Sequence, residues 1–339
     1  MKKLGSYELT GHLTSQNSGY SIWGFGKKNG KDYFLKQFLS PKFPENDTVS
    51  SPARLAKIKK KCERFEQKKA AIYKMINDHS DGNAVRVEEF FRVESKYYIS
   101  MRKIEAIPCT VEMIASLTER EKRYLCAVIA HGIAGLHKGR VVHADLKHDN
   151  ILFMRSPSGN VTAKIIDFDS GFLETDPPVE GEEIIGDQVY FSPEACQTFM
   201  GGNPELTCKM DVFALGVLFH QYFSGTLPAF DPELGGCAGE VVAKGGTLTL
   251  ADNLSAGVRK ILTCMLDADP HKRPSAMAVY AAFSGKKLAD VLKVEEETLA
   301  RILEEAHEEK PVAMPTSIPM AEPSATPSRG GTFFTPGDL

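Results

Sequence analysis

The sequence predicts an α+β protein in two parts: a small strand-rich N-terminal part with one main helix, and a larger, mainly helical C-terminal part. Three observations support this. Short β-prone pieces alternate with turn residues between about 7 and 38, which is typical of consecutive antiparallel hairpins. A long helical pattern with one apolar face runs from Pro52 to about Asn77. After Pro108, apolar residues recur at helical spacing over long stretches of the chain, which predicts helices.

The N-terminal part is expected to contain one small antiparallel sheet. The pieces YELTGHL, YSIWGFG and DYFLKQF are separated by Gly, Asn and Ser residues that favour turns. A loop with two prolines, residues 40–51, precedes the helix that begins at Pro52. Two further strand-like segments, VRVEEFFRV and KYYISMR, follow that helix and close this part.

The helix carries a basic run, residues 57–69, that we expect to be a solvated face. Acidic residues interleave with the lysines at helical spacing. The apolar residues follow one face, at Ile58, Cys62, Phe65 and Ile72. The chain as a whole has 41 Lys and Arg against 44 Asp and Glu, a formal net charge of -3. This balance argues against a general attraction to nucleic acid or to an anionic membrane.

The C-terminal part begins with a strongly amphipathic pattern from Thr118 to Lys138. Strand-like segments near VVH and at AKIIDF follow. Further helices are expected near 211–223, 256–266 and 275–283. A charged helix should then cover 286–310, and the Pro-, Ser- and Thr-rich residues 311–339 should form a disordered tail or a linker, because they offer too little apolar surface to balance the entropy of ordering.

The composition is that of an ordinary globular protein, with 42% hydrophobic and 25% charged residues. The seven cysteines are scattered and form no CxxC pair, which fits reduced thiols in a cytoplasmic protein. The N-terminus MKKLGSYEL lacks an apolar signal core, and the longest apolar stretch, residues 212–223, is too short to span ~30 Å of hydrocarbon. We therefore expect a cytoplasmic protein that binds neither membrane nor nucleic acid.

Three short segments carry the chemistry expected of phosphoryl transfer. In HADLKHDNIL, Asp145 can direct a carboxylate at a hydroxyl, Asn150 can offer an amide oxygen to a cation, and Lys147 between them can offset phosphate charge. In IIDFDSG, Asp167 follows a buried strand, and one carboxylate with one amide suits magnesium. In DYFLKQF, Lys36 lies on a strand and is suited to holding phosphate oxygens.

These residues resemble the motifs of the eukaryotic-like protein kinase family over roughly residues 7–284. HADLKHDNIL resembles HRDLKxxN, and DFD resembles DFG. The segments SPE, DVFALG and KRPS resemble, in order, the end of the activation segment, the helix that anchors the catalytic loop, and the box that contributes a structural arginine. The ordered set carries the resemblance, because each motif alone is weak evidence.

The resemblance implies a bilobal protein-kinase-like fold, with residues 1–104 as the N-lobe and residues 105–285 as the C-lobe. It implies ATP as cofactor, with Mg²⁺ or alternatively Mn²⁺. Asp145 would orient the acceptor hydroxyl, Lys147 would clamp the phosphate, and Asn150 and Asp167 would bind the metal. Of the structural residues, Glu194 of SPE would pair with Arg273, and Asp211 would anchor the catalytic loop.

The implied nucleotide site lies mainly in the N-lobe. Lys36 would hold the α and β phosphates, and Gly19 is the only glycine retained from the family's Gly-rich loop, here TSQNSG. The glutamate that orients Lys36 should be Glu66, with Glu63 as the alternative. Adenine should lie near Met101, the residue before the hinge, and near the hinge itself, formed by Arg102, Lys103 and Ile104.

The sequence departs from the family's pattern at three more positions. Asp169 stands where DFG has Gly, which removes conformational freedom there. Asp187 stands where the family has Thr, and its carboxylate could pair with Lys147 as an inhibitory contact. Ala144 stands where HRD has Arg, which in the family gathers an activation-loop phosphate. The residues 40–52 form an apparent insertion that could be regulatory.

The preferred reading is an ATP- and Mg²⁺-dependent Ser/Thr protein kinase that acts on unidentified protein substrates and could act on itself. Lys147 resembles the Ser/Thr-directed branch of the family, and Thr326 and Thr335 in the tail precede proline as candidate phosphorylation sites. The first alternative is a pseudokinase that holds nucleotide or a partner without efficient catalysis. A small-molecule kinase is the third reading, weakened by the SPE and KRPS segments.

Overall fold

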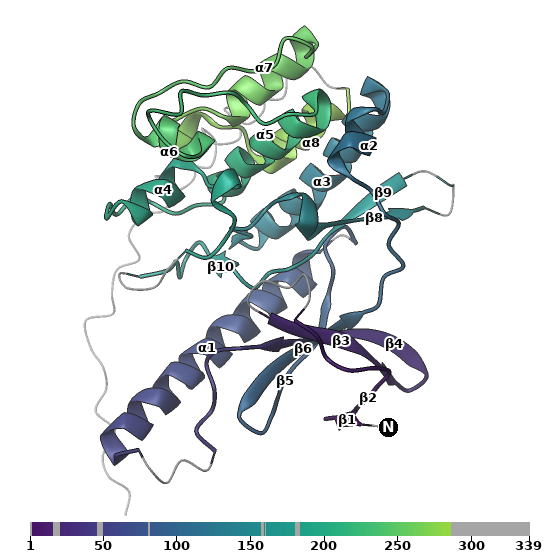
Figure 1. The fold of residues 1–339 in the computed structure, drawn as a ribbon, viewed down its shortest axis with the longest axis vertical. Coiled ribbons are helices and arrows are strands. Elements are labelled where there is room, and N and C mark those ends of the chain that lie inside the picture. The colour runs from purple at the N-terminus through teal and green to yellow at the C-terminus, as the bar shows by residue number, and fades with distance from the viewer. Residues whose placement is uncertain are drawn as a thin grey trace, which may run out of the picture. The chain divides into compact units, whose positions relative to one another are not determined.

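The computed structural model describes residues 2–15, 21–45, 50–80, 82–156, 159, 161–179 and 184–285, all within one unit, Met1–Glu295. Three predictions lie outside these residues: the role of Gly19, the charged helix 286–310 and the tail 311–339. The described residues form two lobes, one built around a sheet and the other mainly from helices (Figure 1). This is the α+β arrangement that the sequence predicts.

The N-lobe contains an antiparallel sheet of six strands in the order β1-β2-β3-β4-β6-β5. The strands are β1 (Lys3–Leu4), β2 (Tyr7–Leu9), β3 (Ser21–Lys28), β4 (Lys31–Phe38), β5 (Val87–Val93) and β6 (Lys96–Arg102). Asn29 and Gly30 connect β3 to β4 with φ of 53° and 73°. Two positive φ angles in a two-residue loop match the twist of a hairpin, which explains the Asn-Gly pair at this turn.

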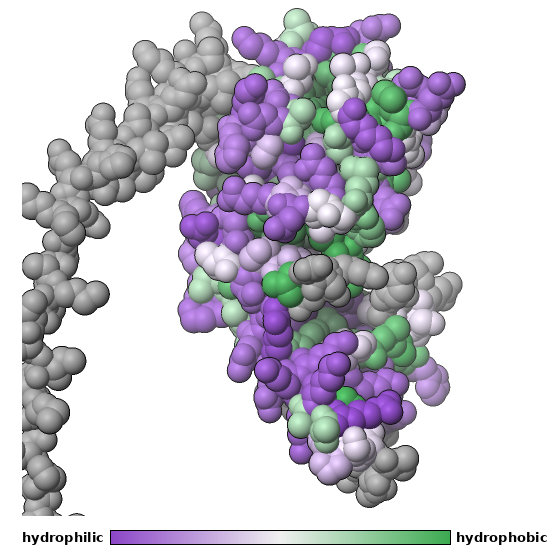
Figure 2. Space-filling model, turned by 90° about the vertical axis from the view of Figure 1, so that its left-hand side faces the viewer, coloured by the Kyte–Doolittle hydropathy of each residue, from purple (hydrophilic) through white to green (hydrophobic). Residues whose placement is uncertain are grey.

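Helix α1 (Pro52–His79) packs against the sheet and the C-lobe. The side chain of Ser51 caps its first turn, and Pro52 occupies a position where a missing backbone N–H costs nothing. The expected basic solvated face is correct for most of the run; Figure 2 shows a largely hydrophilic surface on this side of the N-lobe. The expectation is wrong for Lys69, which is buried in the same stripe as Ile72 and Ile76.

The C-lobe is built around α3 (Glu119–Lys138) and α5 (Lys209–Ser224). A capping box between Thr118 and Glu121 starts α3, and nearly every side chain of α5 is buried. The other helices are α2 (Val111–Ala115), α4 (Pro193–Phe199), α6 (Ala238–Ala243), α7 (Ala256–Met265) and α8 (Ala276–Phe283). Within the part of the chain described, no helix is both long and apolar enough to cross a membrane.

Two pairs of short strands position the catalytic segments between the lobes. β7 (Val141–Val142) pairs with β10 (Phe172–Leu173), and β8 (Ile151–Arg155) pairs with β9 (Val161–Ile165). The HADLKHDN loop therefore lies between β7 and β8, and the DFD turn lies between β9 and β10. A hydrophobic core runs beneath them from Phe38 and Ile72 in the N-lobe to Phe283 in the C-lobe.

Candidate active site

The catalytic loop is fixed by one buried carboxylate from α5. Asp211 accepts hydrogen bonds from the backbone N–H groups of His143 (2.8 Å, Oδ2) and Ala144 (3.0 Å, Oδ1), and it is 1% exposed. Ala144 has a φ of 65°, a conformation that is unfavourable for a residue with a Cβ. The two bonds to Asp211 hold the backbone in this conformation. The anchoring role implied for Asp211 has this geometric basis.

Two polar side chains of the loop, those of Lys147 and Asn150, converge on the Asp145 carboxylate. Its Oδ2 lies 2.9 Å from the amide nitrogen of Asn150 and 3.2 Å from Nζ of Lys147. Asn150 also donates to the backbone oxygen of Asp145 at 2.7 Å. Because both N–H bonds of the amide are directed at Asp145, the amide oxygen of Asn150 is the atom oriented for another ligand.

The DFD turn brings Asp167 to Lys36 of β4. Nζ of Lys36 lies 2.7 Å from Oδ1 of Asp167 and 2.8 Å from Oδ2 of Asp169. Burial by itself would lower the pKa of Lys36, but the charges of Asp169 and Asp167 outweigh burial and raise it. For Asp167, burial would raise the pKa, but the charge and hydrogen bond of Lys36 lower it. Lys36 and Asp167 are therefore an ion pair with both partners charged.

An apolar cavity of about 310 Å³ adjoins this ion pair between the lobes. Its lining includes aromatic residues of β3 and β4 on one side and Leu152 and Ile166 on the other. Three residues expected to contact adenine, Met101, Arg102 and Ile104, line it. Lys103 is absent from the lining, and its backbone N–H donates to the carbonyl of Asp32 at 3.1 Å.

A second, polar cavity opens beside the first and shares Lys36 and Asp167 with it. Asp145, Lys147, Asn150, Asp167 and Asp169 all line this polar cavity. The catalytic, phosphate-binding and metal-binding candidates from three separate segments thus meet in one cleft. An apolar slot that leads into a charged cleft is the shape expected of a nucleotide site, with the base at one end and the phosphates at the other.

The prediction for the glutamate that orients Lys36 is wrong for both candidates. Glu66 accepts a hydrogen bond from the hydroxyl of Tyr97 at 2.6 Å, and Glu63 is exposed. The carboxylates that contact Lys36 come from Asp167 and Asp169 instead. Helix α1 offers the site a lysine: Nζ of Lys69 donates to the backbone oxygen of Asp169 at 2.5 Å.

The Asp187 carboxylate also lies elsewhere than we hypothesised. It accepts a hydrogen bond from the backbone N–H of Val189 at 3.1 Å and so caps the short helical turn Gln188–Tyr190. Lys147 pairs with Asp145 rather than with Asp187. The backbone N–H of Asp187 donates to Oδ1 of Asp145 at 2.8 Å, so this segment supports the Asp145 carboxylate and does not neutralise Lys147.

Gly186 permits this contact between the activation segment and the catalytic loop. A Cβ at this position would lie 2.8 Å from the carbonyl oxygen of Ala144 and 2.7 Å from the Phe191 ring. Those distances are shorter than van der Waals contact, so any larger residue would push the segment away from Asp145.

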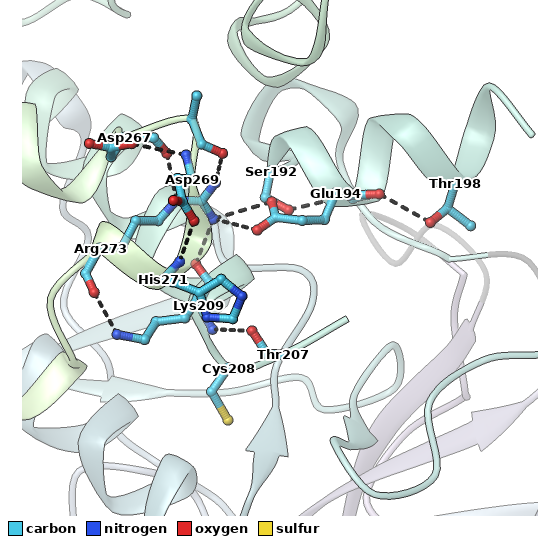
Figure 3. A network of polar contacts seen from close by, with 12 residues as sticks. Ser192, Glu194, Thr198, Thr207, Cys208, Lys209, Asp267, Asp269, His271 and Arg273 are labelled. Carbon is cyan, nitrogen blue, oxygen red and sulfur yellow. Dashed lines mark hydrogen bonds and ion pairs between the residues drawn. The ribbon is translucent and has the colours of Figure 1, made fainter. Parts of the chain in front are cut away.

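The ion pair implied between Glu194 and Arg273 is present and buried (Figure 3). Nη1 of Arg273 lies 2.8 Å from Oε1 of Glu194, and the guanidinium also donates to the carbonyls of Lys209, Asp267 and Ala268. This network joins α4, which follows the activation segment, to the start of α5. It thereby fixes the surface beside the catalytic loop.

The contacts of Lys69 and Asp169 are functional features that the sequence analysis missed. One signal was available: Lys69 falls at helical spacing with Cys62, Ile72 and Ile76, so a lysine interrupts an apolar stripe. A buried lysine requires a nearby acceptor or carboxylate, and Asp169 is an unusual acid at the other end of the same site. A contact between Lys69 and Asp169 could therefore have been predicted from the sequence.

Comparison with known proteins agrees with the geometry. A family model described as protein kinase domain matches residues 53–282. A calcium and calcium/calmodulin-dependent serine/threonine-protein kinase of Lilium longiflorum is 30% identical over 165 residues, covering 47% of this chain and 30% of that protein. Serine/threonine protein kinase OSK3 of Oryza sativa subsp. indica is 28% identical over 222 residues, 62% of this chain and 39% of that protein.

A third relative, the ovarian-specific serine/threonine-protein kinase Lok of Drosophila melanogaster, is 32% identical over 151 residues, covering 43% of this chain and 30% of that protein. The matched segments span less than two fifths of each of these three relatives. The family match covers nearly all of α1, β5, β6 and the C-lobe, and it includes the catalytic loop, the DFD turn and the Glu194–Arg273 pair, whereas β1–β4 with Lys36 lie before it. The chain belongs to the protein kinase family, and the predicted fold class is confirmed.

Proposed function

We propose that the chain is a catalytically active Ser/Thr protein kinase that depends on ATP and a divalent metal ion. One observation carries the proposal: Lys36, Asp145, Lys147, Asn150 and Asp167 line one cleft that opens from an apolar cavity. The relatives are named as serine/threonine protein kinases, which supports the hydroxyl-directed reaction.

The donor set suits Mg²⁺. The described residues contain no group of three or more His, Cys, Asp or Glu side chains placed to hold a metal ion. Mg²⁺ commonly uses one or two carboxylates and takes its other ligands from phosphates and water. Asp167 and the amide oxygen of Asn150 would hold the ion here. When bound, it would neutralise charge on the phosphate oxygens during transfer.

The protein residues divide the remaining work. Lys36, kept charged by its carboxylates, would bind phosphate oxygens of ATP. Asp145 would accept a hydrogen bond from the incoming Ser or Thr hydroxyl and orient its oxygen toward the γ-phosphoryl group. Lys147 lies 3.2 Å from Asp145, close enough to place its ammonium beside the transferring group, where negative charge is spread over three oxygens.

The test is transfer of label from γ-labelled ATP with Mg²⁺ to the chain itself and to a mixed Ser/Thr peptide library. The matched variant is Asp167→Asn, which keeps the shape of the side chain and removes its charge. We expect label from the native chain and at least about a hundredfold less from the variant, as for loss of a group that stabilises developing charge. Equal labelling of both proteins refutes the proposal.

A pseudokinase is the second candidate, favoured by the engagement of Lys36 with two carboxylates and the absence of Glu66 from the contacts of Lys36. It predicts ATP-dependent thermal stabilisation without transfer of label. The same two proteins therefore separate the candidates when melting temperature is measured with and without ATP and Mg²⁺.

A further inference from the structure

The α1 side of the site carries a charge opposite to the one that the family resemblance implies. The resemblance implies a glutamate on this helix directed at Lys36. In the structure the helix residue that contacts the site is Lys69, which is 7% exposed. The Glu66 carboxylate instead accepts a hydrogen bond from the hydroxyl of Tyr97. The carboxylate that contacts Lys36 in addition to Asp167 is Asp169, at 2.8 Å.

These departures balance each other. Lys36 and Lys69 bring two basic groups, and Asp167 and Asp169 bring two acidic groups, to one cluster of side chains. An α1 glutamate in place of Lys69, with Asp169 kept, would put three carboxylates around Lys36. A glycine at 169, with Lys69 kept, would leave two cations and one carboxylate. Burying a polar or charged group without a partner is costly, and the hydrogen bond from Lys69 to the backbone oxygen of Asp169 links the two departures.

We propose that Asp169 is the positioning residue that orients Lys36 for the phosphates of ATP, in place of a glutamate on α1, and that Lys69 holds the turn at Asp169 through its backbone oxygen. The contacts support this division of roles. Lys69 donates to the backbone oxygen of Asp169, which fixes the turn, and Asp169 then directs Oδ2 at Lys36. Lys36 contacts Asp167 through Oδ1, which leaves the orientation of Oδ2 suited to a metal ion.

This inference rests on the proposed kinase function for its activity readout, and on the structure alone for its stability readout. The variants are Lys69→Glu, Asp169→Asn and the double variant, which moves one carboxylate from residue 169 to residue 69. Asparagine keeps the shape of aspartate and adds no backbone freedom. Lys74→Met is the matched control on the same helix, since Lys74 is exposed and pairs with Asp78, one turn further along the helix surface.

The readouts are kcat and the KM for ATP in the labelling assay, and the melting temperature without nucleotide. Each single variant should lower kcat/KM for ATP at least about tenfold, and the double variant should recover at least about tenfold over the worse single variant, as strongly coupled neighbours do. The KM for ATP should rise in Asp169→Asn, because a misplaced Lys36 binds the phosphates less well. Lys74→Met should match the native chain.

Three results would overturn the inference. Effects of the two substitutions on kcat/KM that multiply, with no recovery, would show that residues 69 and 169 act independently. Higher activity of Asp169→Asn than of the native chain would show that Asp169 restrains Lys36 instead of orienting it. A loss in Glu66→Gln as large as in Asp169→Asn would return the orienting role to Glu66.

Failure of the kinase proposal is distinguishable from failure of this inference. If the native chain transfers no label, the cycle is measured by melting temperature. Lys69→Glu and Asp169→Asn should each lower the melting temperature. The decrease in the double variant should be smaller than the sum of the decreases in the two single variants. Additive decreases overturn the inference whether or not the chain is active. If the native chain is active but the effects of the two substitutions are additive, the kinase proposal stands and the proposal for Asp169 and Lys69 is wrong.

Discussion

Substitution of Arg273 by alanine tests how far one buried network holds the C-lobe together. The Arg273 side chain is fully buried, and it donates to both oxygens of Glu194 and to the carbonyls of Lys209, Asp267 and Ala268 at 2.7 to 3.2 Å. Alanine would leave the Glu194 carboxylate, itself 4% exposed, without a cation. Breaking a buried ion pair by removing one partner costs about 3 to 5 kcal/mol.

That free energy corresponds to a large change in melting temperature. In a domain of this size 1 kcal/mol shifts the melting temperature by about 2 to 4 °C, so Arg273→Ala should lower it by about 6 to 20 °C. The assay is thermal unfolding followed by circular dichroism. Lys272→Ala is the control, because Lys272 is an exposed neighbour in a weak surface pair with Asp269 and should change the melting temperature little.

A double variant identifies the cause of the loss. Glu194→Gln with Arg273→Met removes both charges and keeps most of the volume, so it should be more stable than Arg273→Ala. The reasoning is refuted if Arg273→Ala melts within about 2 °C of the native chain. It is also refuted if the double variant is the less stable of the two, because an unpaired Glu194 charge could then not be the reason for the loss.

Three further predictions concern the activation segment and α5. Gly186→Ala should lower kcat at least about tenfold with little change in melting temperature, since its Cβ would press on Ala144 and Phe191; native kcat would contradict the contact. Phosphatase treatment should leave the labelling rate of the native chain unchanged, because Ala144 offers no guanidinium to an activation-loop phosphate; a lower rate would contradict this. Burial lowers the pKa of His220, so below about pH 6.5 the unfolded state binds a proton that the folded state does not. The free energy of unfolding should therefore decrease as the pH is lowered, by up to about 1.4 kcal/mol per pH unit. His220→Gln should reduce that slope in melts at pH 5.5 and 7.5, and an identical slope would argue against the assignment.

Much of the fold follows from local sequence patterns. The long patterns at 52–77 and 118–138 predicted α1 and α3 to within two residues, because a long apolar stripe at helical spacing is a repeated signal. The short helices α2, α4 and α6 were missed, because five to seven residues give too few repeats for periodicity to show. Strand β1 was missed for the same reason.

The candidate site was predictable where its residues lie close together in the chain. Asp145, Lys147 and Asn150 are fixed relative to one another by a single loop, so their spacing defines their geometry. The partner of Lys36 was not predictable in this way. Glu66 was chosen by helical spacing alone, but which side of α1 meets β4 depends on packing between distant segments. Lys69 and Asp169 meet across 100 residues of chain.

The missing arginine of the catalytic loop is understandable from the contacts that the activation segment makes instead. Glu174 forms an ion pair with Arg140, at 3.0 Å, and accepts a hydrogen bond from the backbone N–H of Cys208, at 2.9 Å. The backbone of Asp187 bonds to Asp145. These contacts use carboxylates and backbone groups that are always present, whereas a phosphate must be added. An arginine at residue 144 would be a further cation in the site without a permanent partner. Alanine at this position and the contacts of Glu174 and Asp187 therefore agree: the segment is held by groups that the chain itself encodes.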